Sequence, residues 1–303
     1  MDPLRRMAVF AMVVEQRSMS AAARMLGMST SAVSQQIRQL ERDGGVTLLH
    51  RSTRKLTLTA AGERYYEGCS AMVAAARDAQ LQLAQVRDAP TGELRVAAPV
   101  GFARHVATAL TGLLVANSDL NLRLLVDDQW IDLIEHRIDL ALRFGRMPSS
   151  NWVARKVCDF EQLVCAAPAY LRRCGTPVVV ADLLHHDWLV FAPGGTERVL
   201  EFTGPSGEAQ VLRVEGRTSS NNQYALHQMC VAGAGLSVQV RADVAEDLQA
   251  GRLVEVLPHW RVPAMNGWAV TPQRDAQPAK VRHAIAALQA YLSGLPGASE
   301  ASL

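Results

Sequence analysis

Hydroxyl, amide and guanidinium side chains recur at steps of three or four residues between Ser29 and Asp43. Projected as a helix, one arc about 100° wide holds no carboxylate; its members are Ser31, Ser34, Gln35, Arg38 and Arg42. Val33, Ile37 and Leu40 fall in a separate arc of about 60°, which predicts the packed side of a helix over 30–43. Such polar groups can hydrogen-bond base edges and phosphates in a major groove. Alone, the pattern is equally typical of a solvated polar face.

The preceding residues predict the elements that would position this face. Apolar residues at helical spacing predict a first helix over 3–16. Ser18 or Ser20 can cap a short second helix, Gly27 can form a tight turn, and Ser29 can cap the third helix. Two helices joined by a short turn that contains glycine are the signature of a helix-turn-helix.

The segment after the third helix predicts a wing. Residues 46–50 and 55–59 resemble two short strands, with a basic, hydroxyl-rich tip between them. A hairpin in this place would meet phosphate or the minor groove. The tip residues expected to make those contacts are Arg51, Thr53 and Arg54. Each of them singly is also typical of an ordinary charged hairpin tip.

A heptad pattern follows, beginning after Thr59. Apolar residues alternate at steps of four and three for about three heptads; they are Tyr65, Cys69, Met72, Ala76, Ala79, Leu83 and Val86. A helix over 59–87 would be roughly 40 Å long, and its apolar stripe favours pairing with a second copy of the chain. We expect dimer contacts at Tyr65, Met72, Ala76 and Leu83. The alternative is that the helix packs on its own chain.

Charge is distributed unevenly along the 303 residues. The net charge is only +2, but residues 1–60 carry +5 and the remainder −3, which indicates a polyanion partner at one end. Hydrophobic residues make up 49% and charged residues 20%, which excludes intrinsic disorder. No apolar stretch approaches the ~18 residues of a membrane span, and no signal-peptide pattern opens the chain. We therefore expect a cytoplasmic protein without a membrane partner.

Residues 92–303 alternate between strand and helix patterns, which predicts α/β architecture. Strands are predicted over 94–98, 120–126, 138–144, 163–167, 188–191, 211–214, 236–240, 253–257 and 267–271. Helices are predicted over 103–115, 222–232 and 278–292. Residues 88–92, which contain Pro90 and Gly92, would join this body to the preceding helix.

The chain resembles the LysR-type transcriptional regulators. The resemblance rests on residues 20–23, 29–34 and 36–41, on Leu48-Leu49-His50-Arg51 and on 58–62, in the order and spacing of that family. Residues 92–96, 137–145 and 166–171 resemble later landmarks of its effector-binding domain. The chain departs from the pattern at Gly44-Gly45, where Leu-Gly is common, and at Leu49, where phenylalanine is usual. Gly44 could loosen the end of the third helix without abolishing the fold.

The resemblance implies a division of the chain. Residues 1–58 would be a winged helix-turn-helix, 59–91 a dimerisation helix with a hinge, and 92–303 an effector-binding domain. That domain would resemble periplasmic binding proteins, with subdomain I over 92–162 and 267–303 and subdomain II over 163–266. The implied function is transcription regulation through DNA binding, as a homodimer or homotetramer that responds to a small effector. DNA contacts are then expected from Ser29, Thr30, Ser31, Ser34, Gln35, Arg38, Arg51, Thr53 and Arg54.

Ligands of open α/β sheets bind beyond the carboxyl ends of the strands. The effector contacts expected there are Val100, Gly101, Phe102, Asp127, Arg143, Ser219, Ser220 and Asn221. Hydroxyls, an arginine and a helix N-terminus suit a small carboxylate or another polar metabolite. Arg143 could instead be a structural partner of Asp127 or Asp139, and the two serines could simply cap a helix.

Other functions have weaker support. Gly233-Ala234-Gly235 is a poor dinucleotide signal, and His185-His186-Asp187 is more typical of a loop than of a metal or acid–base site. We expect no catalytic residue, no metal and no cofactor beyond the effector. Five scattered cysteines make a disulfide framework improbable. Peroxide-sensing relatives use two cysteines, but the spacing of Cys158, Cys165 and Cys174 identifies no such pair. Redox sensing, an α/β enzyme and a transport protein remain the alternatives.

Overall fold

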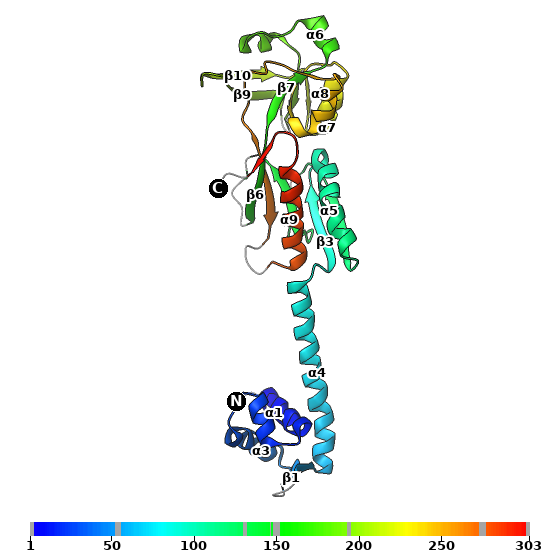
Figure 1. The fold of residues 1–303 in the computed structure, drawn as a ribbon, viewed down its shortest axis with the longest axis vertical. Coiled ribbons are helices and arrows are strands. Elements are labelled where there is room, and N and C mark those ends of the chain that lie inside the picture. Colours follow the sequence, from blue (N-terminus) through cyan, green and yellow to red (C-terminus); the bar gives the residue numbers. More distant parts are fainter. Residues whose placement is uncertain are drawn as a thin grey trace. The chain divides into compact units, whose positions relative to one another are not determined.

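The computed structural model describes residues 3–51, 56–129, 132–145, 147, 152–192, 195–272 and 277–300. The chain forms two compact units, an N-terminal unit over Met1–Gln85 and a C-terminal unit over Val86–Leu303. In Figure 1 the first unit runs from blue to cyan and the second from cyan to red. Among the described residues, none of the helices combines the length and apolar character that a membrane span requires.

Three helices build the core of the N-terminal unit, as the sequence predicts. They are α1 (Pro3–Gln16), α2 (Met19–Met25) and α3 (Thr30–Gly44). Phe10, Val33 and Ile37 are fully buried where these helices meet. Ser18, rather than Ser20, caps α2, because its side chain accepts the amide hydrogen of Ala21. The helix-turn-helix is therefore held by an apolar core and by a capped second helix.

A short hairpin follows α3. Strands β1 (Leu49–Arg51) and β2 (Leu56–Leu58) pair antiparallel, with Leu49 opposite Leu58. They are shorter than predicted, because Val46 closes the turn that ends α3 and the Thr47 carbonyl accepts a hydrogen bond from the Thr59 hydroxyl instead of pairing in the hairpin. Thr53 and Arg54 of the predicted wing tip lie outside the described residues, as does the side chain of Arg51.

Helix α4 (Ala60–Asp88) begins at a cap that the sequence predicted. The Thr59 hydroxyl accepts the amide hydrogen of Gly62 at 2.9 Å. Tyr65 and Cys69 pack into the core of the N-terminal unit, with the Tyr65 and Phe10 ring centroids 5.6 Å apart. Leu83 is 72% exposed. The first turns of α4 thus pack on their own chain, whereas the later part of the apolar stripe is open.

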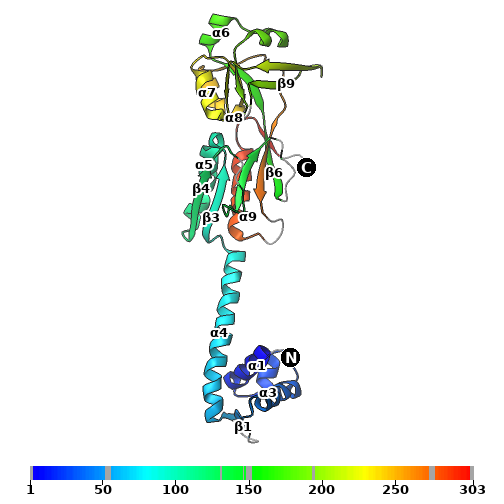
Figure 2. The same cartoon turned by 180° about the vertical axis from the view of Figure 1, so that it is seen from behind.

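The C-terminal unit contains a six-stranded sheet in the order β15-β6-β14-β5-β3-β4. Its strands are β3 (Gly92–Ala98), β4 (Leu120–Val126), β5 (Leu140–Phe144), β6 (Val153–Phe160), β14 (Met265–Thr271) and β15 (Ala298–Glu300). Strand β3 runs parallel to β4 and β5, and β14 runs antiparallel to β5 and β6. Helices α5 (Ala103–Ala116) and α9 (Ala279–Ser293) pack together over this sheet (Figure 2).

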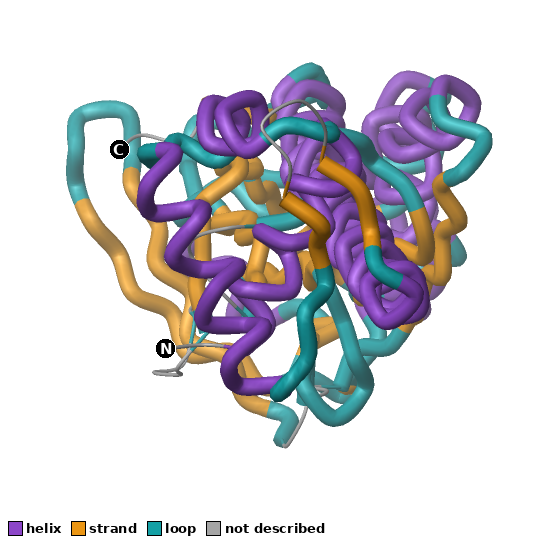
Figure 3. The backbone as a smooth tube through the Cα atoms, turned by 90° about the horizontal axis from the view of Figure 1, so that it is seen from below, coloured by secondary structure: helices purple, strands orange, loops and turns teal. Residues whose placement is uncertain are grey.

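A second, five-stranded sheet has the order β11-β8-β12-β7-β13. Its strands are β7 (Gln162–Ala166), β8 (Trp188–Phe191), β11 (Thr218–Ser220), β12 (Leu236–Val240) and β13 (Val254–Glu255), and β9 (Glu197–Thr203) pairs separately with β10 (Ala209–Glu215). The helical segments beside them are α6 (Pro168–Cys174), η2 (Val180–His185), α7 (Gln223–Val231) and α8 (Arg241–Gln249). Strands and helices alternate along the C-terminal unit, which confirms the predicted α/β class; Figure 3 colours the helices purple and the strands orange.

Several elements of the C-terminal unit differ from the sequence prediction, and β6, β9 and α8 show why local patterns did not indicate them. Strand β6 contains Arg155, Lys156 and Asp159, so its apolar pattern is interrupted. Strand β9 alternates exposed glutamates with buried Leu200 and Phe202. Helix α8 carries a weak apolar stripe in the sequence RADVAEDLQ. In each element the tertiary contacts, rather than the local pattern, decide the structure.

Candidate nucleic-acid interface and ligand cleft

The polar face of α3 lies at the surface of the N-terminal unit. Ser31, Gln35, Arg38 and Arg42 are exposed and Ser34 is half-buried, while Val33 and Ile37 on the opposite side are fully buried. A surface hollow is lined by Ser31, Gln35, Arg38, Glu41, Arg42, Gly45, Val46 and Thr47. The structure therefore brings the predicted polar residues together on one accessible face.

Both ends of α3 are fixed by local hydrogen bonds. The Ser29 hydroxyl accepts the amide hydrogen of Ala32 at 3.2 Å and lies 3.0 Å from the Ser31 hydroxyl. Gly45 has a φ of 64°, and its N–H closes the last turn, so glycine suits this position. The unusual Gly44 is accommodated as the last residue of the helix. Ser29 therefore caps the N-terminus of α3 and also lies at the edge of its polar face.

Glu41 lies outside the polar arc predicted for α3 and has a structural role. Its Oε1 accepts the amide hydrogens of Leu48 at 3.0 Å and Leu49 at 3.2 Å. These two residues lead into β1, so the carboxylate connects α3 directly to the hairpin. Glu41 therefore fixes the position of the hairpin relative to the polar face.

The predicted effector residues near β3 divide into accessible and buried members. Val100, Gly101 and Phe102 form η1 (Val100–Phe102) at the start of α5. Phe102 is only 5% exposed, and its ring stacks on Phe144 with a centroid distance of 3.8 Å. Val100 and Gly101 instead line an open pocket. Phe102 thus supports the wall of the site from within the core.

Arg143 is buried on β5, although Asp127 is exposed. Burial lowers the pKa of the Arg143 guanidinium, and the charge of Asp127 opposes this shift. Asp139, the other partner considered, accepts hydrogen bonds from the backbone N–H of Arg95 and from Lys280. Of these two carboxylates, Asp127 is therefore the one whose charge acts on Arg143.

The serines expected at a helix N-terminus lie instead in a strand. Ser219 and Ser220 belong to β11, and Ser220 accepts the amide hydrogen of Asn222. Asn222 is the N-cap of α7, where its Oδ1 accepts the amide hydrogen of Ala225 at 2.8 Å. The alternative that these serines cap a helix is wrong, because both lie in β11 and the N-cap of α7 is Asn222.

Asn222 also connects the two sheets of the C-terminal unit. Its Nδ2 donates to Asp128 Oδ2 at 2.9 Å, and Asp128 Oδ1 accepts the amide hydrogen of Val100 at 3.0 Å. Asp128 follows β4 of the first sheet, and Asn222 follows β11 of the second. The carboxyl ends of strands from both sheets therefore meet here, and this is where ligands of open α/β sheets bind.

A cavity of about 220 Å³ lies beside this contact, between η1 and α5 on one side and α7, β12 and α8 on the other. Its lining residues are Val100, Gly101, Arg104, Gln223, Tyr224, His227, Gln239 and Asp243. Only Val100 and Gly101 were predicted. The sequence contains a signal for two of the other residues, because Gln223 and His227 are polar residues spaced i, i+4 on a predicted helix.

The histidine and cysteine alternatives find little structural support. His186 Nδ1 lies 3.2 Å from the Tyr170 hydroxyl, which accepts the amide hydrogen of Asp187. Across the described part of the chain, no group of three or more His, Cys, Asp or Glu side chains could hold a metal ion. Burial raises the pKa of the Cys158 thiol to about 12. This environment disfavours the reactive thiolate.

Cys165 and Cys230 lie close together but in an unreactive setting. Their Sγ atoms are 4.0 Å apart and both residues are buried. The hydrogen bond with Cys230 and burial raise the pKa of the Cys165 thiol well above its usual range. Cys174 is the one exposed cysteine of the five.

We therefore expect a single fast-reacting thiol per folded chain when the protein is treated with Ellman's reagent at neutral pH. The other four thiols should react only on unfolding, because they are buried. Cys174→Ser should abolish the fast phase. Rapid reaction of two or more thiols in that variant would favour the redox-sensing alternative instead.

Comparisons with known proteins agree with this architecture. Residues 4–63 match the model "Bacterial regulatory helix-turn-helix protein, lysR family", and residues 87–293 match the model "LysR substrate binding domain". The chain is 36% identical to the HTH-type transcriptional regulator DmlR of Escherichia coli strain K12, over 96% of this chain and 94% of that protein. It is 35% identical to the HTH-type transcriptional regulator PtxR of Pseudomonas aeruginosa PAO1, over 97% and 94%.

Solved structures show the same fold. The full-length Vibrio cholerae virulence activator AphB matches with a TM-score of 0.73 and 26% identity, over 96% of this chain and 99% of that chain. CrgA of Neisseria meningitidis matches with a TM-score of 0.58 and 27% identity, over 95% and 98%. The chain belongs to the LysR family of DNA-binding transcriptional regulators. Its relatives are named as regulators, so the predicted regulatory function is confirmed and the enzyme alternative is set aside.

Proposed function

We propose that the exposed face of α3 reads the operator of this regulator. The observation that carries the proposal is the separation of α3 into a buried apolar side and an exposed side that presents hydroxyl, amide and guanidinium groups. Arg38 is best suited to bidentate recognition of guanine, and Gln35 to recognition of adenine. Ser31, Ser34 and Thr30 have shorter side chains, and their hydroxyls would hydrogen-bond to bases or phosphates. Arg51, Thr53 and Arg54 are proposed to contact DNA from the wing.

The later part of α4 is proposed to dimerise the chain. Met72 is half-buried, whereas Ala76 and Leu83 are exposed, so an apolar stripe is left open after the turns that carry Tyr65. A two-fold dimer would place two α3 helices on two half-sites of an operator. A homotetramer, formed by two such dimers, would bind two operator regions. Because the proposed partner is DNA, the protein is proposed to act in the cytoplasm.

A small effector is proposed to bind in the C-terminal unit, where the two sheets meet. The residues proposed to contact it are Val100, Gly101, Asp127, Arg143, Ser219, Ser220 and Asn221. Phe102 would support the site from the core. An effector that binds one arrangement of the protein more tightly than another would shift the population between them. Saturating effector should therefore change the DNA footprint or the DNA bend; an unchanged footprint and bend would contradict this mechanism.

The test of DNA binding is a titration of the purified protein with a labelled fragment from upstream of its own gene, at several salt concentrations. We expect tight binding that weakens about a thousandfold or more between about 50 and 200 mM salt, because basic side chains release counterions from phosphates. A random-sequence fragment of equal length is the control and should bind more weakly. Failure to bind even a random-sequence pool at low salt would overturn the proposal.

A further inference from the structure

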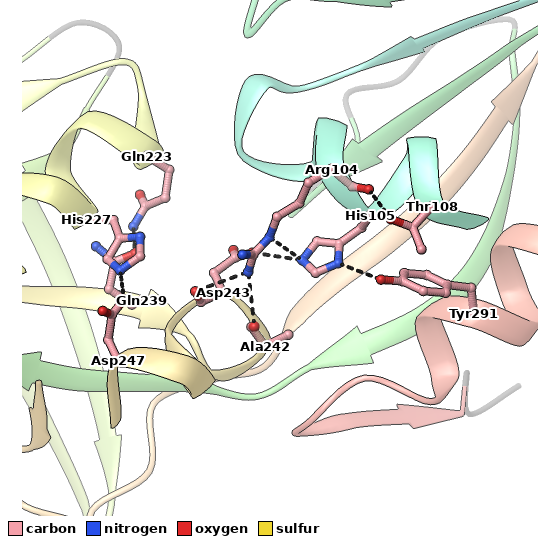
Figure 4. Close-up of polar contacts among 10 residues, drawn as sticks. All are labelled: Arg104, His105, Thr108, Gln223, His227, Gln239, Ala242, Asp243, Asp247 and Tyr291. Carbon is pink, nitrogen blue, oxygen red and sulfur yellow. Dashed lines mark hydrogen bonds and ion pairs between the residues drawn. The ribbon is translucent and has the colours of Figure 1, made fainter. Parts of the chain in front are cut away.

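Polar side chains line the cavity between η1, α5, α7, β12 and α8. Hydrogen bonds within the protein use some of their donor and acceptor atoms and leave others for a ligand. Figure 4 shows Gln223 and His227 on one side and Arg104 and Asp243 on the other. None of these four was among the residues proposed for the effector from strand ends. We propose that this cavity binds a small molecule with a protonated primary amine, and that a zwitterionic α-amino acid fits it most completely. The regulatory meaning of such a ligand rests on the function proposed above, but its binding does not.

His227 is held in the cavity wall by a buried hydrogen bond. Its Nε2 lies 2.7 Å from Asp247 Oδ2, and Asp247 Oδ1 accepts from Arg252. Burial raises the pKa of Asp247, but the hydrogen bonds from Arg252 and His227 outweigh this effect and lower it overall. An ionised Asp247 can only accept, so a ring hydrogen of His227 is on Nε2. This bond fixes the orientation of the His227 ring in the lining of the cavity.

Gln223 presents an acceptor. Its Nε2 donates to the Val238 carbonyl at 2.9 Å and to Gln239 Oε1 at 2.8 Å, which uses both amide hydrogens. Gln239 is 1% exposed, and its own Nε2 donates to Ser237. Both ends of the Gln239 amide are thus engaged, and it holds Gln223 in one orientation. The side chain of Gln223 can therefore offer a ligand only its carbonyl oxygen.

Asp243 presents a second acceptor, and it carries charge. Its Oδ1 lies 3.1 Å from His105 Nε2 and 3.5 Å from the Arg104 guanidinium. These contacts leave Oδ2 for a ligand. An ammonium group has three N–H donors and no acceptor, so it can donate to both Gln223 and Asp243.

Arg104 completes the match to a zwitterion. One terminal nitrogen donates to the carbonyls of Ala242 and Asp243, which anchors the guanidinium on α8. The other terminal nitrogen can donate to a ligand carboxylate. Because Arg104 and Asp243 carry opposite charges, a zwitterion suits the cavity better than the simple carboxylate expected from the sequence. The volume of about 220 Å³ is below the roughly 300 Å³ at which common ligand pockets begin, so the ligand must be small.

The test uses the full-length wild-type protein and isothermal titration calorimetry with each of the twenty standard amino acids. At least one of them should bind. The hydroxy acid of the same skeleton (lactate for alanine, for example) should bind at least about tenfold more weakly, because a hydroxyl has one donor and no charge. Binding of none of the twenty, or equal binding of the hydroxy acid, would overturn the proposal.

Two variants test the acceptors without a large change of shape. Asp243→Asn and Gln223→Leu should each weaken the binding amino acid at least about tenfold. Gln210→Ala, on exposed β10, is the matched control and should leave binding unchanged. Unchanged binding in both cavity variants would contradict the assignment. A DNA titration on the same sample separates the two proposals, since DNA binding without amino-acid binding refutes only this one, and the reverse refutes only the operator function.

Discussion

Gly62→Ala should strongly destabilise the N-terminal unit and weaken DNA binding. A Cβ at this position would lie 2.1 Å from the Leu48 carbonyl oxygen, which is backbone and cannot swing aside. Gly62 is buried where α4 starts beside the hairpin, and its N–H is held by Thr59. We expect a loss of about 3 kcal/mol or more in the free energy of unfolding of this unit. Thermal unfolding followed by circular dichroism measures it.

Gly68→Ala is the matched control on the same helix. A Cβ at Gly68 meets nothing within 4 Å, so alanine should stabilise the helix by about 0.5–1 kcal/mol. The two variants make the same chemical change six residues apart, with opposite expected signs. Equal stability of both variants would show that α4 does not approach Leu48 as closely as described.

Leu83→Glu should convert the proposed dimer to monomers without unfolding the chain. Leu83 is 72% exposed within one chain, so a charge costs little there. In a dimer seam, two copies would lose their apolar burial, about 3 kcal/mol in total, which weakens dimerisation at least about a hundredfold. Light scattering measures the mass, and a DNA titration should show weaker operator binding, because half-sites are no longer bound together.

Gln85→Glu is the control for this prediction. It introduces the same charge two residues further on, at an exposed position that points away from the apolar stripe. It should leave both mass and operator affinity unchanged. A Leu83→Glu protein that remains dimeric would place the dimer contact elsewhere on the chain.

The N-terminal unit was the most predictable part of the chain. Its helices carry strong local signals: apolar periodicity in α1, the cap at Ser29, and the left-handed turn at Gly45. The heptad pattern of α4 was correctly read as helical, but periodicity cannot tell which apolar partner a stripe meets. Tyr65 and Cys69 pack on α1 through contacts that are distant in sequence.

The ligand cavity was less predictable for a similar physical reason. Strand ends can be read from local patterns, so Val100, Gly101 and Asp127 were anticipated. The polarity of the cavity depends on hydrogen bonds between remote residues, such as His227 with Asp247 and Arg104 with the backbone of α8. The roles of Gln223 and Asp243 follow only from which atoms their own hydrogen bonds leave available.

The exposed face of α3 is proposed to read DNA sequence, and the most direct test is selection of binding sites from a random DNA pool. Wild-type protein should enrich one motif. Arg38→Ala should lose discrimination at one base position by about 1–3 kcal/mol, while Arg123→Ala, which removes an equal charge at an exposed position of β4, should enrich the wild-type motif. If Arg38→Ala enriches the same motif with the same discrimination, α3 does not read the operator through Arg38.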